Sequence, residues 1–129
     1  MMRELLLPSL YVFFGGGIGS VLRYLIAIYM YKNVSASYPF GTFAVNVIGS
    51  FTIGFIITHM SSGSPGFHYW RQLFVVGLIG GFTTFSAFSW DTLALFKHHE
   101  TGAALLNIAA NIILCLCAVW VGSLVGDKM

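Results

Sequence analysis

Gly80–Ser89, which reads Gly-Gly-Phe-Thr-Thr-Phe-Ser-Ala-Phe-Ser, lies in the middle of an apolar segment long enough to cross a bilayer. Glycine weakens helix interiors, and serine and threonine offer the backbone competing hydrogen bonds. Irregular backbone at membrane depth persists only where it is buried in protein or lines a wet cavity. The stretch therefore predicts a broken membrane helix at the functional centre of a membrane protein.

The composition of the whole chain agrees with a membrane location. Of the 129 residues, 57% are hydrophobic and 8% are charged, and the mean hydropathy is +0.85. A soluble domain carries about 25% charged residues, so this chain lacks the polar surface that water requires. The formal net charge of +2 is too small to suggest nucleic-acid binding.

Four apolar segments reach the roughly 20 residues that a bilayer span needs. They run over about 5–31, 40–60, 69–96 and 102–125. The connections are short and polar, and none has room for a soluble domain. We therefore expect an all-α membrane protein with a single four-helix transmembrane domain over 1–129, whose third helix is broken near its middle. The first segment lacks an Ala-x-Ala-like site, which favours an uncleaved helix over a secretory signal.

The basic residues give little indication of orientation. Arg3, Arg71 and Lys128 fall on the side of the N-terminus, and Lys32 and Lys97 fall on the other side. A positive-inside orientation requires a clear excess on one side. Two interpretations stay open: features other than charge set the orientation, or the chain inserts both ways and pairs as an antiparallel dimer.

The second span carries a stripe of polar and small residues. Thr42, Asn46, Ser50 and Gly54 follow one another at intervals of four, which places them on one helix face. The Asn46 amide offers hydrogen-bond donors without a fixed charge. Such a stripe either joins neighbouring helices or lines a pathway, and polar groups inside a membrane indicate function by default.

The third segment places aromatic and hydroxyl groups beside the predicted break. Phe85 and Phe88 are three residues apart and share a face, and Ser86 and Ser89 have the same spacing. The edge of a phenyl ring is positive and can face an anion. A broken helix also exposes backbone groups as ion ligands. Simple packing is the alternative for an aromatic pair at this spacing.

The fourth span repeats the four-residue spacing with Asn107, Asn111 and Cys115. Each unsatisfied polar group in hydrocarbon costs several kcal/mol, so the two amides indicate a polar path. On the first span, Arg23 ends a glycine-rich stretch. It either anchors the helix at the interface or attracts anions toward a vestibule.

The spans lack the groups that several other membrane functions use. They contain no pair of carboxylates for a proton relay, and no serine has a histidine and an acid in a plausible arrangement. Enzyme activity therefore has little support. Amides, hydroxyls and ring edges without fixed charge favour a channel-like pathway for a small anion, which can bind and still leave.

Three groups of residues resemble the motifs of the CrcB/Fluc fluoride channels. They are Gly16-x-x-Gly19-x-x-x-Arg23-Tyr24, Gly41-Thr42-x-x-x-Asn46-x-x-Gly49-Ser50 and Gly77-x-x-Gly80-Gly81-Phe82-Thr83-Thr84-Phe85-Ser86-x-Phe88-Ser89. The third motif is highly specific. The length and the number of spans agree with the family over the whole chain.

The resemblance implies passive, selective fluoride efflux through a dual-topology, antiparallel homodimer with two pores. The protein would cross the inner (plasma) membrane several times, with fluoride, lipid and a second copy as its partners. The positions that would form the fluoride pathway are Asn46, Phe85, Phe88, Ser86, Ser89, Thr42, Asn107, Asn111 and Arg23. The resemblance also implies a structural Na⁺ ion at the dimer interface, held by the main-chain carbonyls of Gly80 and Thr83 from both subunits.

A few positions differ from the family pattern. Ala87 stands where the family usually has Thr or Ser, and Asp91 stands where Glu is commoner. Asn107 and Asn111 occupy the places of a Tyr and a Ser four residues apart. Two other functions stay open. A small dual-topology, proton-coupled multidrug exporter would need a carboxylate in an early span, and in a non-transporting membrane assembly subunit the polar stripes would serve packing alone.

Overall fold

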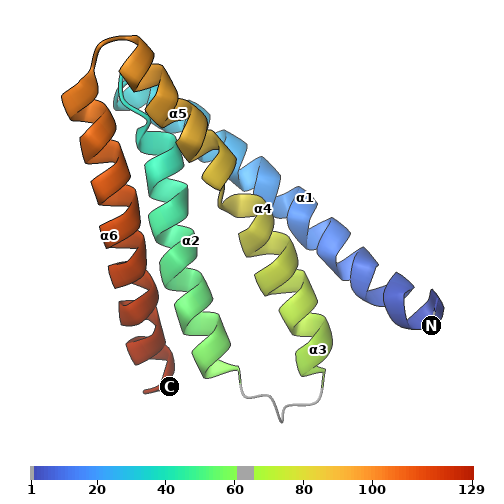
Figure 1. The fold of residues 1–129 in the computed structure, drawn as a ribbon. Helices are drawn as coiled ribbons and strands as arrows, with labels where there is room; N and C mark the ends of the chain where they lie inside the picture. Colours follow the sequence, from blue (N-terminus) through green and yellow to red (C-terminus); the bar gives the residue numbers. More distant parts are fainter. Residues whose placement is uncertain (1, 61–65) are drawn as a thin grey trace.

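The computed structural model of the protein describes residues 2–60 and 66–129, and every regular element in these ranges is a helix (Figure 1). In chain order the elements are α1 (Met2–Asn33), α2 (Phe40–His59), α3 (Phe67–Trp70), η1 (Arg71–Ile79), α4 (Gly80–Phe82), α5 (Phe85–Lys97) and α6 (Thr101–Gly126). The elements α3, η1, α4 and α5 follow one another along the third span, which is interrupted between α4 and α5, and η1 is a π-helix. Most of the expected connection after the second span, residues 61–65, lies outside the described residues.

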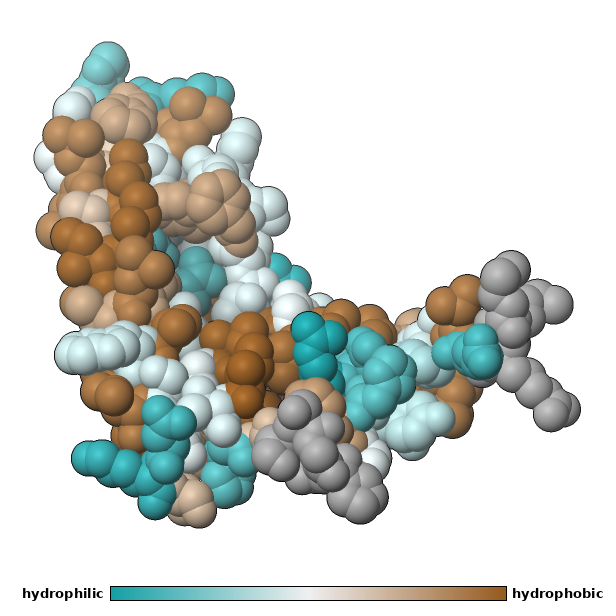
Figure 2. Space-filling model, turned by 60° about the horizontal axis from the view of Figure 1, so that its bottom comes forward, coloured by the Kyte–Doolittle hydropathy of each residue, from teal (hydrophilic) through white to brown (hydrophobic). Residues whose placement is uncertain are grey.

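Within the described residues, four segments are long and apolar enough to cross a membrane: Glu4–Asn33, Phe40–His59, Phe67–Lys97 and Thr101–Gly126. The expectation of four spans is thus confirmed, and each end lies within two residues of the expected one. Apolar residues cover the long flank of the bundle, and hydrophilic residues gather near the helix ends (Figure 2). This distribution is that of an integral, multi-pass membrane protein.

The third span is broken at Thr83 and Thr84, as the glycine and hydroxyl composition predicts. Both residues are extended, with φ and ψ of −86° and 157° at Thr83 and of −154° and 117° at Thr84. The Thr84 hydroxyl then accepts a hydrogen bond from the backbone N–H of Ala87 (3.1 Å), which caps the start of α5. The break therefore has a local cause, because Thr83 is the C-cap of α4 and Thr84 is the N-cap of α5.

The bundle is built from two close helix pairs. α2 packs along α6, and α1 runs obliquely along η1 and α4 (Figure 1). In each pair the backbones meet at glycine: a Cβ on Gly19 would overlap the carbonyl oxygen of Leu78, and a Cβ on Gly122 would overlap that of Phe51. Small residues of this kind allow membrane helices to approach closely. The α2–α6 pair and α5 carry the site described below.

The turn between α5 and α6 contains a backbone conformation that suits glycine. His99 has a φ of 61°, in the left-handed region. The N–H of Glu100 donates to the carbonyl of Leu95 (2.9 Å), and the N–H of His99 donates to that of Phe96 (3.1 Å). This pair of bonds is a Schellman motif, in which glycine is the usual residue at the left-handed position.

Replacing His99 by Gly is expected to stabilise the protein, because the left-handed conformation of a residue with a Cβ costs about 1 kcal/mol. Thermal unfolding in detergent would measure the gain as a higher midpoint. His98→Gly is the matched control, since His98 has a φ of −85° and gains nothing from glycine. An equal increase in both variants would contradict the assignment.

Candidate functional site

An open cavity of about 460 Å³ lies where the break in the third span faces α2 and α6. None of its lining side chains carries a charge. The lining residues are Asn46, Gly49, Ser50, Ile53, Ile79, Thr83, Thr84, Phe85, Phe88, Asn111, Ile112, Cys115 and Leu116. The cavity thus brings together four of the expected pathway residues, Asn46, Phe85, Phe88 and Asn111, from three different spans.

The side chain of Asn46 bridges the helix break. Its Oδ1 accepts a hydrogen bond from the N–H of Thr84 (2.9 Å), and its Nδ2 donates to the carbonyl of Thr84 (3.2 Å). The same Nδ2 donates to Oδ1 of Asn111 on α6 (3.3 Å). The amide therefore supplies an acceptor for the Thr84 N–H, which the break removes from the helix, and a further donor for the Thr84 carbonyl, which starts the hydrogen bonds of α5.

A chain of hydrogen bonds continues from Asn111 into the bundle. Asn111 Nδ2 donates to the carbonyl oxygen and to Oδ1 of Asn107, both at 3.0 Å. Asn107 Nδ2 donates to the hydroxyl of Thr92 on α5 (2.9 Å), and that hydroxyl donates to the carbonyl of Phe88 (2.8 Å). Asn107 is 1% exposed and lines neither this cavity nor the second one described below.

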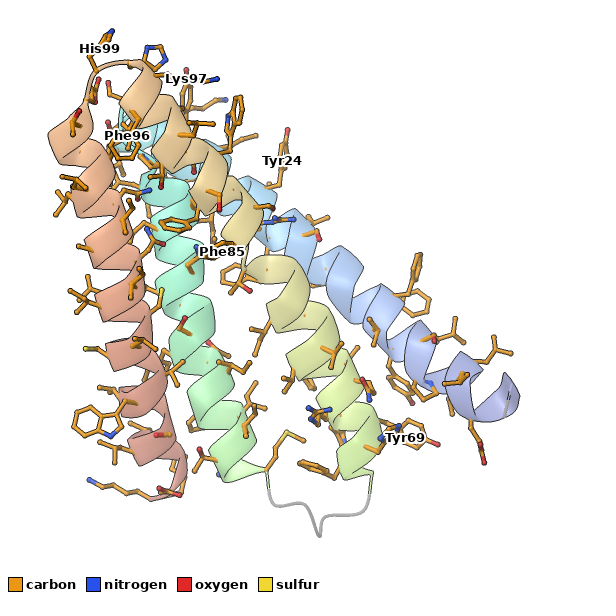
Figure 3. The ribbon with its side chains drawn as sticks, viewed as in Figure 1. Tyr24, Tyr69, Phe85, Phe96, Lys97 and His99 are labelled. Carbon is orange, nitrogen blue, oxygen red and sulfur yellow. The ribbon has the colours of Figure 1, made fainter. Side chains whose placement is uncertain are left out.

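The two phenylalanines differ sharply in exposure. Phe88 is 8% exposed, whereas Phe85, which lies at the break between α4 and α5 (Figure 3), is 78% exposed. Their ring centroids are 5.3 Å apart, with the rings tilted by 54°. Phe88 thus closes the inner wall of the cavity, and Phe85 presents most of its ring to the surroundings of the single chain.

Ser86 and Ser89 lie on α5 beside the phenylalanines but do not line the cavity. The hydroxyl of Ser86 is 3.1 Å from that of Thr84. The hydroxyl of Ser89 donates to the carbonyl of Phe85 in its own helix (2.9 Å). Both serines are exposed in the single chain.

A second cavity, of about 380 Å³, lies at the end of the bundle where the α1–α2 connection meets α5. The hydroxyl of Thr42 donates to Oδ2 of Asp91 there (2.6 Å), and Tyr38 and His98 also line the cavity. Burial raises the pKa of the Tyr38 phenol above its ordinary value. Thr42 precedes Asn46 by one helical turn on α2, so the two cavities follow one another along the same helix face.

Arg23 lies half-buried on α1 and lines neither of these cavities. Of the two cysteines, both of which are free, Cys115 borders the first cavity and Cys117 is exposed. Within residues 2–60 and 66–129, no three His, Cys, Asp or Glu side chains gather as they would to hold a metal ion.

The break also frees carbonyl oxygens from helical hydrogen bonds, and those of Gly80 and Thr83 are among them. In a continuous helix the N–H of Thr84 would donate to the carbonyl of Gly80, and the N–H of Ala87 would donate to that of Thr83. These N–H groups donate instead to Asn46 Oδ1 and to the Thr84 hydroxyl. Unwound backbone carbonyls are ligands for Na⁺ in membrane proteins. Gly80 and Thr83 therefore have the chemistry that a sodium site requires.

Three residues of the site were not among the positions expected to form the pathway: Thr84, Asp91 and Thr92. Thr84 could have been found as a helix-capping residue, because a threonine directly before a helical segment commonly serves as the N-cap. Asp91 and Thr92 follow Phe88 by three and four residues, which places them next to it on the α5 surface. Their partners, Thr42 and Asn107, depend on how the spans pack.

Comparison with known proteins identifies the family. Residues 10–123 match the family described as "CrcB-like protein, Camphor Resistance (CrcB)". The chain is 36% identical over 120 residues to a protein named fluoride-specific ion channel FluC from Acidobacterium capsulatum, covering 93% of this chain and 96% of that protein. Proteins of the same name are 44% identical over 111 residues in Rhizobium meliloti (84% and 86% covered) and 46% identical over 123 residues in Shewanella oneidensis (94% of each). The resemblance read from the three motifs is confirmed, and the chain belongs to the CrcB-like family.

Proposed function

We propose that this chain is a fluoride-selective ion channel that mediates passive fluoride efflux and so lowers cytoplasmic fluoride. The main observation behind this proposal is the cavity at the helix break, where amides, hydroxyls and phenyl rings meet among aliphatic side chains and no lining side chain is charged. Neutral donors can replace the water around a small anion without holding it permanently. The name shared by relatives that cover most of the chain supports fluoride as that anion.

Binding of fluoride in this cavity is an exchange of hydrogen-bond acceptors. The Nδ2 group of Asn46 already donates to Thr84 and to Asn111. An anion that enters takes over the donation now made to Asn111 Oδ1, and the positive edges of the Phe85 and Phe88 rings face it from α5. When the anion leaves, Asn111 accepts the bond again. The site thus returns to a satisfied state, which favours release.

The second cavity extends the pathway by one turn of α2. An ion that passes Phe88 reaches the space beside Thr42 and Asp91, which opens at the end of the bundle. The hydroxyl of Thr42 is turned to the carboxylate of Asp91, and it can turn to an anion instead, because a hydroxyl rotates to suit its partner. A negative-inside membrane potential drives the anion outward, so no energy-coupling site is required.

The functional unit that we propose is an antiparallel homodimer in the inner (plasma) membrane. The exposure of Phe85, together with the near balance of basic residues on the two sides, favours a second, inverted copy against this face. The carbonyls of Gly80 and Thr83 from both copies would hold a structural Na⁺ ion there. That ion would fix the two breaks against each other.

Fluoride efflux from liposomes tests the proposal. Purified protein in vesicles loaded with potassium fluoride is expected to release fluoride when valinomycin sets the potential, with little release of chloride from matched vesicles. Phe85→Ile is expected to lower the rate of fluoride release about tenfold, because the free energy of one aromatic contact corresponds to about that factor. Phe96→Ile, on the same helix but outside both cavities, is the matched control and should leave the rate unchanged.

The competing functions give different results. Release of organic cations that depends on a pH gradient would indicate a proton-coupled exporter. If vesicles that contain folded protein release no fluoride, the result would instead favour the function of a non-transporting assembly subunit.

A further inference from the structure

Asn107 is the most deeply buried polar residue of the network, at 1% exposed, yet it lies outside both cavities. Three hydrogen bonds join it to two residues of the same network: its carbonyl and Oδ1 accept from Asn111, and its Nδ2 donates to Thr92. It therefore contacts no position that an ion in the cavity would occupy. Its connection to the pathway runs through Asn111.

The direction of each hydrogen bond fixes the next one. In the structure the hydroxyl of Thr92 donates its hydrogen to the carbonyl of Phe88 and accepts the bond from α6. Asn107 must then turn its NH₂ group to Thr92 and its Oδ1 to Asn111. If the Asn107 amide were flipped, its Oδ1 would face the hydroxyl oxygen of Thr92, and both atoms would be acceptors. A buried acceptor without a donor is costly.

The same logic sets the orientation of the amide in the cavity wall. Since Asn107 presents two acceptors, Asn111 turns its NH₂ group toward Asn107. Its Oδ1 is left facing Asn46, whose Nδ2 donates to it. Asn111 thus offers the cavity an oxygen and keeps its N–H groups away from it.

We propose that Asn107 is a positioning residue, which locks the Asn111 amide with its oxygen toward Asn46 and so prevents Asn111 from becoming a second N–H donor to the anion. This inference rests on the proposed function, because it concerns how tightly the same cavity holds fluoride. A cavity with two amide donors would bind the anion more tightly and release it more slowly. The lock therefore favours throughput over affinity.

The test is the concentration dependence of fluoride efflux from liposomes that contain Asn107→Leu. Leucine has a similar volume, but its side chain accepts no hydrogen bond. Asn111 then keeps only its bond to the backbone carbonyl of residue 107, so its amide turns more easily. The half-saturating fluoride concentration is expected to fall about tenfold, because one additional buried hydrogen bond to the anion strengthens binding by about that factor. The maximal rate is expected to fall as well, since the anion leaves more slowly. A variant in which the rate falls while half-saturation is unchanged would overturn the proposal, since a merely structural role lowers the rate alone.

Two further variants keep the test independent of how well Asn107→Leu folds. Thr92→Val removes the acceptor that orients Asn107, and it should shift half-saturation in the same direction. Thr92→Ser retains the hydroxyl and should restore the wild-type value. In a background of Asn111→Ala, Asn107→Leu should no longer alter half-saturation. Additive effects of these two substitutions would show that Asn107 does not act through Asn111.

A measurement without transport separates this inference from the proposed function. In protein labelled with ¹⁵N at asparagine, Asn107→Leu should shift the side-chain NH₂ resonances of Asn111 and speed their exchange with solvent. Unchanged resonances would refute the lock even if fluoride flows. Absent fluoride flux in the wild type, with resonances that shift as expected, would refute the channel and leave the hydrogen-bond lock intact.

Discussion

Asn46→Leu is expected to abolish fluoride efflux, a decrease of at least about a hundredfold, because it removes three hydrogen bonds at once. The Thr84 N–H loses its acceptor, the Thr84 carbonyl loses a second donor beside its own helix, and Asn111 Oδ1 loses its donor. Each buried polar group left without a partner costs about 1–3 kcal/mol. The break would then lose the contact that ties it to α2, and the cavity would lose its central donor.

Initial rates of fluoride release from liposomes, at equal amounts of reconstituted protein, measure this effect. Thr52→Val is the matched control on the same helix. The hydroxyl of Thr52 donates only to the carbonyl of Ile48 in its own helix (2.8 Å) and lies outside both cavities. It should release fluoride at the wild-type rate. If Asn46→Leu also conducts at that rate, neither the bridge nor the donor role assigned to Asn46 holds.

The spans and the break were predictable because their causes are local. A run of about 20 apolar residues is a property of the sequence itself. The hydroxyl and glycine residues around Thr83 and Thr84 weaken a helix wherever they occur. The structure narrows the break from Gly80–Ser89 to these two residues, which are the ones with extended backbone.

The partners of the polar side chains were not predictable, because they depend on how distant spans meet. Asn46 and Thr84 are 38 positions apart, and only the packing of α2 against the break shows that the amide uses both of its ends there. Asn107 and Asn111 share a helix stripe and look alike in sequence. In the fold, Asn111 borders the cavity and Asn107 lies behind it.

Ser89 shows a limit of a different kind. Its spacing from Ser86 agrees with a polar path, yet a serine inside a helix can also donate to the carbonyl four residues before it. The structure has this local bond, to Phe85. The role of Ser89 toward an anion therefore stays a prediction that depends on whether this bond is exchanged.

Gly122→Ala is expected to separate α6 from α2 and to destabilise the fold by several kcal/mol, because no side chain can yield to the new methyl group. A Cβ at this position would overlap the carbonyl oxygen of Phe51 and lie 3.0 Å from the amide nitrogen of Phe55, both of which are backbone atoms. Real Cβ atoms essentially never approach this closely, so one helix must move as a whole. Overpacking of this kind costs about 1–3 kcal/mol even where side chains can adjust.

The movement reaches the site, since α2 carries Asn46 and α6 carries Asn111, and their 3.3 Å hydrogen bond spans the same interface. Gly122→Ala should therefore lose both thermal stability in detergent and fluoride efflux in liposomes. The fraction of protein that stays soluble and monodisperse after heating measures the thermal stability. Gly102→Ala is the matched control on α6, where a new Cβ meets no atom within 4 Å. Alanine is the better helix former, so this control should be as stable as the wild type or more so. A Gly122→Ala protein as stable as that control would mean that α2 and α6 are not held at backbone contact, and the amide bridge between them would have to form at a greater separation.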